Sequence, residues 1–528
     1  MSSPSDERLG GVLVPLFSIP SAASWGIGEF TDVPLLARWL VASGQRLLQL
    51  LPVNEMPPGE ASPYGALSAM ALDPQFVSLR HLRDWTAIGG DDALDAGARD
   101  RLAAVRAAPR VEYDAVRALK LDALRRACAR FVAEELARDT TRARVFRGWC
   151  EREAWWLDDY ALFRAIKAAH GEAPWTAWSD ALRDRRPDAL TAAREAHADE
   201  IRFREYVQWV AGSQWHAVRR AVAPLRLFGD LPFMVGADSA DVWARQDEFR
   251  FDVSVGAPPD AFSADGQDWG LPVYRWDAIA TGGFDWLRQR ARRQAQLYDG
   301  YRVDHLVGFY RTYARPRDGS APFFTPAEEA MQTRLGERVL GVFREPGARI
   351  IAEDLGTVPD FVRASLARLD VPGYKVFRWE RRWHEPGEPF VDPADYPAAA
   401  VATTGTHDTE PLATWWARAP EVERRAVLAV PSIAGRLQDA ERDEAAAGAL
   451  TPAFHAGLVG ALFASPADVL ILPLGDLFGW TDRINDPATI FGENWRWRLP
   501  WPVEALETRP DARAVSERLA AWTSASSR

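Results

Sequence analysis

Short β-rich runs recur along this chain between helical or loop stretches, and this rhythm constrains the fold more than any other feature. Two runs lie near the start, at residues 11–18 and 46–53. Six more follow later in the chain: LRLFGDLPF, YDGYRVDHL, ARIIAEDLG, YKVFRW, VATTGTHD and DVLILPLGD. A strand followed by a helix, repeated about eight times, favours a parallel barrel with the helices outside it. We therefore predict an α/β fold, the (β/α)8 or TIM barrel.

One long stretch interrupts this rhythm. Residues 76–225 are rich in Ala, Arg, Asp and Glu, and Leu121, Leu124, Cys128 and Phe131 recur there at helical spacings of three and four. We expect a mainly helical insertion at 76–225. The start of the barrel would then occupy residues 1–75, and the remainder of the barrel residues 226–528.

Composition excludes some partners. The 528 residues carry a net charge of -11, which disfavours nucleic acid and anionic membranes but is neutral toward sugars. The apolar run at 11–20 follows Asp6 and Glu7 and is broken by prolines, so we interpret it as a barrel strand rather than a signal peptide. With only two cysteines, which we expect to be inert thiols, the sequence favours a reducing cytoplasm.

Carboxylates occur where four of the predicted strands end. They are Asp230, Asp304, Glu353 and Asp408. In a parallel barrel, reactive groups lie at the C-terminal ends of the strands. One such Asp is commonly a helix N-cap, but four carboxylates on one rim repel each other and cost stability, so we favour a functional site.

The spacing of these residues suits cleavage of a glycosidic bond, which needs a proton donor for the leaving oxygen and a second carboxylate facing the anomeric carbon. Arg302 lies two residues before Asp304, on the same face of a strand. A neighbouring cation keeps a carboxylate ionised. Asp304 is therefore the natural anion and Glu353 the natural acid/base, while Asp408 could bind sugar hydroxyls and stabilise positive charge on the ring.

The strand-end motifs RVDH, AEDLG and THD resemble those of the α-amylase superfamily. The finer pattern is similar to amylomaltase, the 4-alpha-glucanotransferase of glycoside hydrolase family 77. The supporting segments are WGIGEF, SPYG, GDLPF, DSADVW, GAPPDAFSADGQDWGLPVY and DRINDPATIFGENWRWRLPW. Together the matches extend from about residue 10 to residue 501.

This resemblance implies a substrate loop in the first part of the catalytic barrel, residues 1–75, and two active-site loops at 256–274 and 476–498. It also implies a role for each candidate residue. Asp304 would be the nucleophile, Glu353 the acid/base and Asp408 the transition-state stabiliser. The residues expected to bind substrate are Tyr64, Asp230, Arg302 and His407 in the cleavage subsite, Asp260, Gln267 and Trp269 on a loop covering the acceptor side, and Asn485 beside the donor groove. Plain packing remains an alternative for Tyr64 and Trp269, and His305 could merely bond a backbone carbonyl.

The implied reaction is transfer of α-1,4-glucan segments between malto-oligosaccharides or starch- and glycogen-derived glucans, with net retention. A hydrolase of the same superfamily is one alternative, and an inactive glucan-binding protein is a remote one. We expect no organic cofactor and no metal, because the sequence has no His/Cys/Asp metal-ligand spacing and neither GxGxxG nor GxxxxGK[ST]. The sequence leaves the oligomeric state open.

Overall fold

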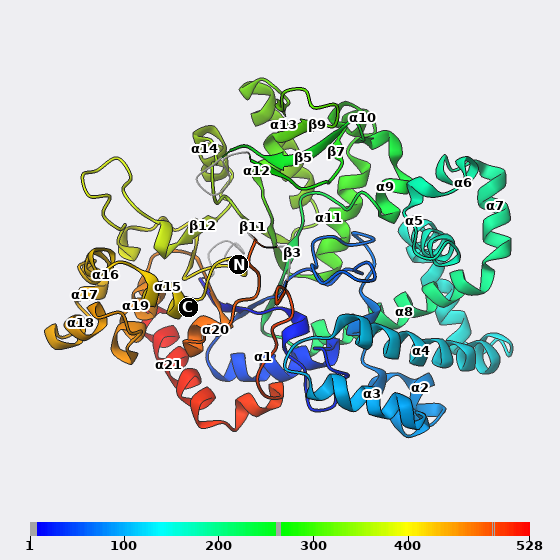
Figure 1. Ribbon diagram of the computed structural model, residues 1–528, viewed down its shortest axis with the longest axis horizontal. Coiled ribbons are helices and arrows are strands. Elements are labelled where there is room, and N and C mark those ends of the chain that lie inside the picture. Colours follow the sequence, from blue (N-terminus) through cyan, green and yellow to red (C-terminus); the bar gives the residue numbers. More distant parts are fainter. Residues whose placement is uncertain (1–7, 260–265, 488, 490–491) are drawn as a thin grey trace.

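A computed structural model describes residues 8–259, 266–487, 489 and 492–528. Eight parallel strands close into a barrel, in the order β1-β14-β13-β12-β11-β8-β3-β2 (Figure 1). These strands are β1 (Leu9–Leu13), β2 (Leu47–Gln49), β3 (Arg226–Leu231), β8 (Gly300–Val303), β11 (Arg349–Ala352), β12 (Gly373–Val376), β13 (Ala400–Thr403) and β14 (Val469–Pro473). The predicted (β/α)8 fold is confirmed. The first predicted strand is shorter than expected, because a 3-10 turn begins at Leu16, directly after Pro15.

Helices cover the outside of the barrel, as Figure 1 shows. Helices α14 (Asp360–Arg368), α13 (Glu329–Arg344), α11 (Asp285–Leu297), α8 (Ala198–Ala221), α1 (Val33–Ala42), α21 (Pro510–Ser526) and α19 (Pro452–Ala464) contact one another in that order. The barrel strands are buried on both faces, with burial running through all of β1 and β14. This explains why the runs are apolar rather than alternating.

The segment between β2 and β3 is helical. It holds α2 (Arg83–Ala87), α3 (Ala96–Ala107), α4 (Tyr113–Phe131), α5 (Thr141–Ala169), α6 (Asp180–Arg183), α7 (Pro187–Ala196) and α8. Leu124, Cys128 and Phe131 are buried along α4, and Leu121 packs against the same core from a half-buried position. Their spacing therefore marks a core-facing stripe.

Two small antiparallel sheets lie outside the barrel. One has the order β10-β9-β5-β6 and the other pairs β4 with β7. Their strands are β4 (Phe249–Arg250), β5 (Val253–Ala257), β6 (Gln267–Asp268), β7 (Val273–Tyr274), β9 (Thr312–Pro316) and β10 (Phe323–Thr325). Gln267, expected on a covering loop, thus belongs to a strand paired with Ala257.

The remaining helices are α9 (Ala240–Ala244), α10 (Trp276–Thr281), α12 (Val307–Tyr310), α15 (Leu412–Arg418), α16 (Glu421–Leu428), α17 (Pro431–Ala434), α18 (Asp439–Ala446) and α20 (Leu474–Phe478). Among the residues placed in the structure, no helix combines the length and apolar character needed to cross a bilayer.

Two glycines of α13 provide a matched test of packing. A Cβ on Gly336 would overlap the buried ring of Tyr310, whereas a Cβ on Gly341 would meet nothing. We expect Gly336→Ala to lower the free energy of unfolding by about 1–3 kcal/mol, because the ring must shift. Gly341→Ala should raise it by about 0.5–1 kcal/mol, because Ala is the better helix former. Urea unfolding of both variants checks this, and equal shifts would contradict the packing.

Candidate active site

A buried arginine on β8 joins three of the carboxyl groups. Nη1 of Arg302 donates to both oxygens of Asp230, at 2.9 and 2.8 Å. Nη2 of Arg302 lies 2.8 Å from Oδ1 of Asp304 and 4.0 Å from Oε2 of Glu353. The Arg302 side chain is only 4% exposed and Asp230 is fully buried. Strand register accounts for this arrangement, because Asp230 and Ile351 flank Arg302 on β3 and β11.

The two carboxyl groups assigned to bond cleavage lie close together. The Asp304 and Glu353 oxygens next to Nη2 of Arg302 are less than about 7 Å apart, since both face one nitrogen. Retaining glycosidases hold their carboxyl pair about 5–5.5 Å apart, and inverting ones about 6.5–9.5 Å. This upper bound on one pair of oxygens accommodates direct attack by Asp304.

Glu353 has the environment of an acid that is protonated near neutrality. Burial raises the pKa of this carboxyl, Arg302 lowers it and Asp304 raises it further, which brings the pKa to about 7. Its oxygens accept backbone hydrogen bonds from His305 at 2.8 Å and Leu355 at 3.0 Å. His305 adopts a left-handed φ of 45°, an uncommon conformation for a non-glycine residue that often marks a functional constraint.

Two aromatic rings pack against the ring of His305, the residue whose backbone amide donates to Glu353. The His305 ring lies 4.9 Å from that of Trp269 and 5.1 Å from that of Phe233, between centroids. Burial lowers the pKa of His305 to about 4, so the imidazole is neutral. Trp269 is half-buried and its indole donates to exposed Gln267 at 2.9 Å. Asp260, expected on the same loop, lies outside the described residues.

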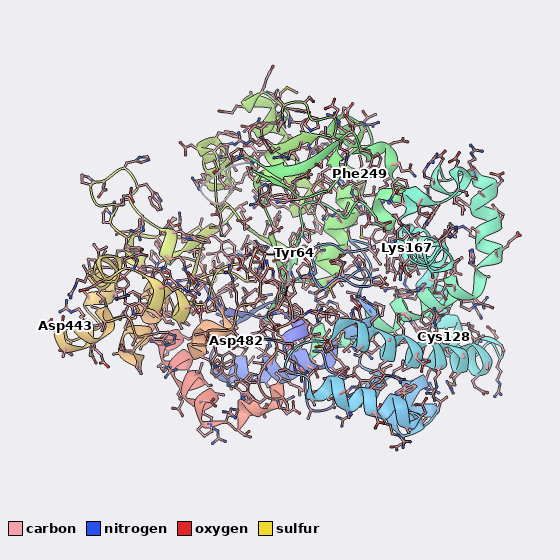
Figure 2. All side chains as sticks on the ribbon, in the orientation of Figure 1. Tyr64, Cys128, Lys167, Phe249, Asp443 and Asp482 are labelled. Carbon is pink, nitrogen blue, oxygen red and sulfur yellow. The ribbon has the colours of Figure 1, made fainter. Side chains whose placement is uncertain are left out.

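A chain of hydrogen bonds extends from Asp230 to the third carboxylate. The Tyr64 hydroxyl donates to Asp230 at 2.8 Å and lies 3.0 Å from Nε2 of His407. The same Nε2 lies 3.2 Å from Asp408, which also accepts from the Asn485 amide at 2.6 Å. Tyr64 lies near the centre of the molecule (Figure 2). Its ring stacks on His407 with centroids 5.4 Å apart.

The electrostatic environment of Asp408 differs from that of Glu353. Burial raises the pKa of Asp408, but His407 and Asn485 lower it more. The pKa of this carboxyl therefore lies well below its usual range. Burial lowers the pKa of His407 while Asp408 raises it above the ordinary value. The two groups therefore stabilise each other's charged forms.

The structure thus places Asp304, Glu353 and Asp408 in one contact network with Asp230, Tyr64, Arg302, His407 and Asn485. Trp269 joins through His305, and Gln267 lies at its outer edge. Trp495 is a neighbour that sequence reasoning missed. The centroid of its ring lies 5.6 Å from those of both Tyr64 and His407. Its position in the ENW part of the family-like late segment could have pointed to it.

A (β/α)8 barrel with a close pair of carboxyl groups on its C-terminal rim, one of them with a pKa near 7, is of the class that acts on glycosidic bonds. The family model for 4-alpha-glucanotransferase matches residues 14–504, and the chain belongs to this family, glycoside hydrolase family 77. The match confirms the resemblance of the strand-end motifs, and the protein is a transferase enzyme.

Individual relatives agree with this assignment. The chain is 33% identical to the 4-alpha-glucanotransferase of Thermus thermophilus over 508 residues, covering 93% of this chain and 95% of the relative. It is 31% identical to that of Chlamydia caviae, covering 94% and 92%. The fold is similar to amylomaltase from Streptococcus agalactiae in complex with acarbose, with a TM-score of 0.82 and 26% identity over 99% of this chain and 100% of that one.

Removing the guanidinium of Arg302 should strongly destabilise the fold. In Arg302→Met, the buried carboxyl of Asp230 loses its cation, which we expect to lower the free energy of unfolding by about 3–5 kcal/mol. The double variant Arg302→Met/Asp230→Asn should lose less than the single one, because the uncompensated charge is gone. Urea unfolding at neutral pH measures both, and an additive loss in the double variant would refute the pairing.

Proposed function

We propose that the enzyme moves α-1,4-glucan segments from a donor glucan to the 4-hydroxyl of an acceptor sugar, through a covalent β-glycosyl ester on Asp304. The observation that carries this proposal is the shared guanidinium of Arg302, which contacts Asp304 at 2.8 Å and lies 4.0 Å from Glu353. This arrangement supports Asp304 and Glu353 acting on one glycosidic bond, the first as nucleophile and the second as acid.

In the first half of the reaction, Glu353 donates its proton to the leaving glycosidic oxygen while Asp304 attacks the anomeric carbon. The leaving chain departs with the proton, and the donor sugar remains as an ester. In the second half, Glu353 takes the proton of the acceptor hydroxyl, whose oxygen displaces Asp304. Two inversions give net retention.

The other residues act on the sugar in the cleavage subsite. Asp408, ionised beside His407 and Asn485, offers acceptor oxygens to ring hydroxyls and stabilises positive charge on the oxocarbenium-like ring. Tyr64 lies beside the subsite and holds Asp230 and His407 in register through its hydroxyl. The amylomaltase from Streptococcus agalactiae was determined with acarbose, which supports a sugar ligand for this fold.

Transfer exceeds hydrolysis only if a sugar reaches the ester in preference to water. His305 donates its backbone amide to Glu353, the proposed proton donor to the leaving group, and its ring contacts Trp269. We assign His305 and Trp269 to the acceptor side. Incubation with maltotriose tests the proposal: a ladder of longer glucans with free glucose is the expected result. A steady gain of reducing ends would favour the hydrolase, and no conversion the inactive binding protein.

The covalent step can be trapped. We expect Glu353→Gln to react with α-maltotriosyl fluoride, since fluoride leaves without a proton donor, and then to stall because no base activates the acceptor. Intact mass spectrometry should show one added maltotriosyl group, and peptide mapping should place it on Asp304. The matched control, Glu353→Gln/Asp304→Asn, should remain unmodified. An adduct on another residue would overturn the assignment of the nucleophile.

The pH dependence of kcat/KM should reflect the titration of Glu353. Its protonated form is the acid, and that form predominates below the pKa of about 7. We therefore expect kcat/KM for maltotriose to fall about tenfold per pH unit above that value, as for loss of a general acid. With α-maltotriosyl fluoride as donor, the first step needs no acid, so its burst rate should lack this alkaline limb. A limb of equal steepness with both donors would assign the titration to another group.

A further inference from the structure

Asp408, the proposed transition-state stabiliser, lies in a loop and contacts a second loop. Asp408 follows β13 and Asn485 follows α20, and neither residue belongs to a helix or strand. The Asn485 side-chain amide donates to Asp408 at 2.6 Å, and its backbone amide donates to the oxygen of His407 at 3.1 Å. Because no strand ladder fixes either residue, the position of the Asp408 carboxylate depends on the contacts between these two loops.

One guanidinium bridges the two loops. Nε of Arg483 donates to the backbone oxygen of Asn485 at 2.7 Å, and Nη2 donates to the backbone oxygen of Asp408, also at 2.7 Å. Nη1 lies 3.3 Å from the carboxylate of Asp486. The guanidinium is planar and presents its donors in a fixed fork, so it holds the oxygens that it binds in a defined relative position. Arg483 therefore sets the backbone of Asp408 against that of Asn485.

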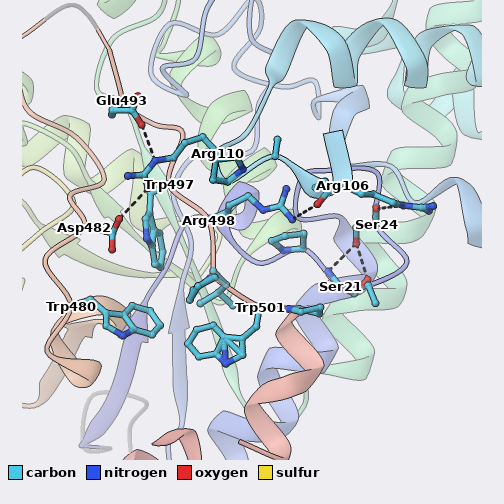
Figure 3. Close-up of a pocket in the computed structure, with 18 residues that line it drawn as sticks. Ser21, Ser24, Arg106, Arg110, Trp480, Asp482, Glu493, Trp497, Arg498 and Trp501 are labelled. Carbon is cyan, nitrogen blue, oxygen red and sulfur yellow. Dashed lines mark hydrogen bonds and ion pairs between the residues drawn. The ribbon is translucent and has the colours of Figure 1, made fainter. Parts of the chain in front are cut away.

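The residue before Arg483 contacts the helical insertion instead. Figure 3 shows Arg110 between the side chains of Asp482 and Glu493, and the ion pairs measure 3.2 and 2.8 Å. Both carboxylates are exposed, at 44% and 72%, and exposed ion pairs contribute little to stability. Hydrogen bonds from a charged donor are roughly twice as strong as neutral ones. The two backbone contacts of Arg483 are therefore the stronger restraint on this part of the loop.

We propose that Arg483 is a positioning residue, whose guanidinium holds the Asp408 loop against Asn485 and so keeps the Asp408 carboxylate in place beside His407. The proposal rests on the function given above, in which Asp408 stabilises the transition state. A misplacement of about 1 Å in such a site can lower the rate about 100-fold. Arg483 acts through the backbone of Asp408, so it has no need to contact the sugar itself.

Removing the guanidinium should slow the reaction more than it weakens binding. We expect Arg483→Ala to lower kcat for maltotriose consumption about 10- to 100-fold and to change KM less than about threefold. Arg483→Lys keeps the charge but lacks the planar fork, so it should stay impaired at least about fivefold. The Arg483 side chain is 33% exposed, so free guanidinium well below denaturing concentrations can reach the gap in Arg483→Ala. It should restore kcat in a saturable manner, and methylammonium should not.

Arg498 provides a matched control. It is half-buried like Arg483, and it also donates to backbone oxygens, those of Gly26, Val105 and Arg106, at 3.2–3.3 Å. These contacts do not involve Asp408, so we expect Arg498→Ala to keep kcat within about twofold. Guanidinium should have no effect on it. An equal loss of kcat in Arg483→Ala and Arg498→Ala, with no recovery in guanidinium, would reduce Arg483 to a folding role and overturn the proposal.

The titration of His407 gives a readout that needs no turnover. Burial lowers the pKa of His407, and Asp408 raises it above its ordinary value. If Arg483 keeps Asp408 beside the imidazole, Arg483→Ala should lower the pKa of His407, whereas the loss of a nearby positive charge alone would raise it. NMR of the imidazole protons measures this, with His407→Asn to assign the signal.

An unchanged or raised pKa of His407 in Arg483→Ala would overturn the positioning role. The same titration separates this proposal from the proposed function. If the unaltered enzyme hydrolysed maltotriose or left it unchanged, transfer would be refuted, and the His407 titration would still decide whether Arg483 holds Asp408 in place.

Discussion

The buried guanidinium of Arg302 is the constraint on which the active site depends. Three carboxyl groups approach it from three different strands, and without the cation their burial at one rim would be strongly unfavourable. The parallel barrel makes this convergence possible, because β3, β8 and β11 end at the same level. Arg302 lies within the barrel wall, between Asp230 on β3 and Ile351 on β11. The cation therefore helps to fix the positions of Asp304 and Glu353 relative to each other.

The environments of the carboxyl groups then divide the chemistry among them. The side chain of Glu353 is 12% exposed and that of Asp408 is 38% exposed. The pKa of Glu353 is raised to about 7 and that of Asp408 is lowered, and their partners contribute to this difference as well as their burial. Asp408 contacts an imidazole and a side-chain amide, both of which lower its pKa, whereas the negative charge of Asp304 raises the pKa of Glu353. One barrel rim thus supplies a carboxylate and a carboxylic acid at neutral pH.

The sequence predicted the barrel and the residues at its strand ends because both follow from short-range patterns. Each apolar run ends in a polar group, and the two-residue spacing of Arg302 and Asp304 fixes a shared face. Two-residue strands such as β4, β6 and β7 carry no periodicity, so the small sheets were not predicted. The hydroxyl contacts of Tyr64 and the position of Trp495 were also missed, because segments far apart in the chain create them.

The helical insertion takes part in this long-range assembly. The Tyr113 hydroxyl, at the start of α4, donates to the backbone oxygen of Trp495 at 2.7 Å, and the Trp495 ring packs against Tyr64 and His407. The Val111 amide donates to the oxygen of Arg496 at 2.9 Å. A segment from the insertion thus braces the late loop that carries Asn485. Sites built on loops are less precisely positioned than sites built on helices or strands. Contacts with the start of α4 hold Trp495 and Arg496 in place, as a preorganised site requires.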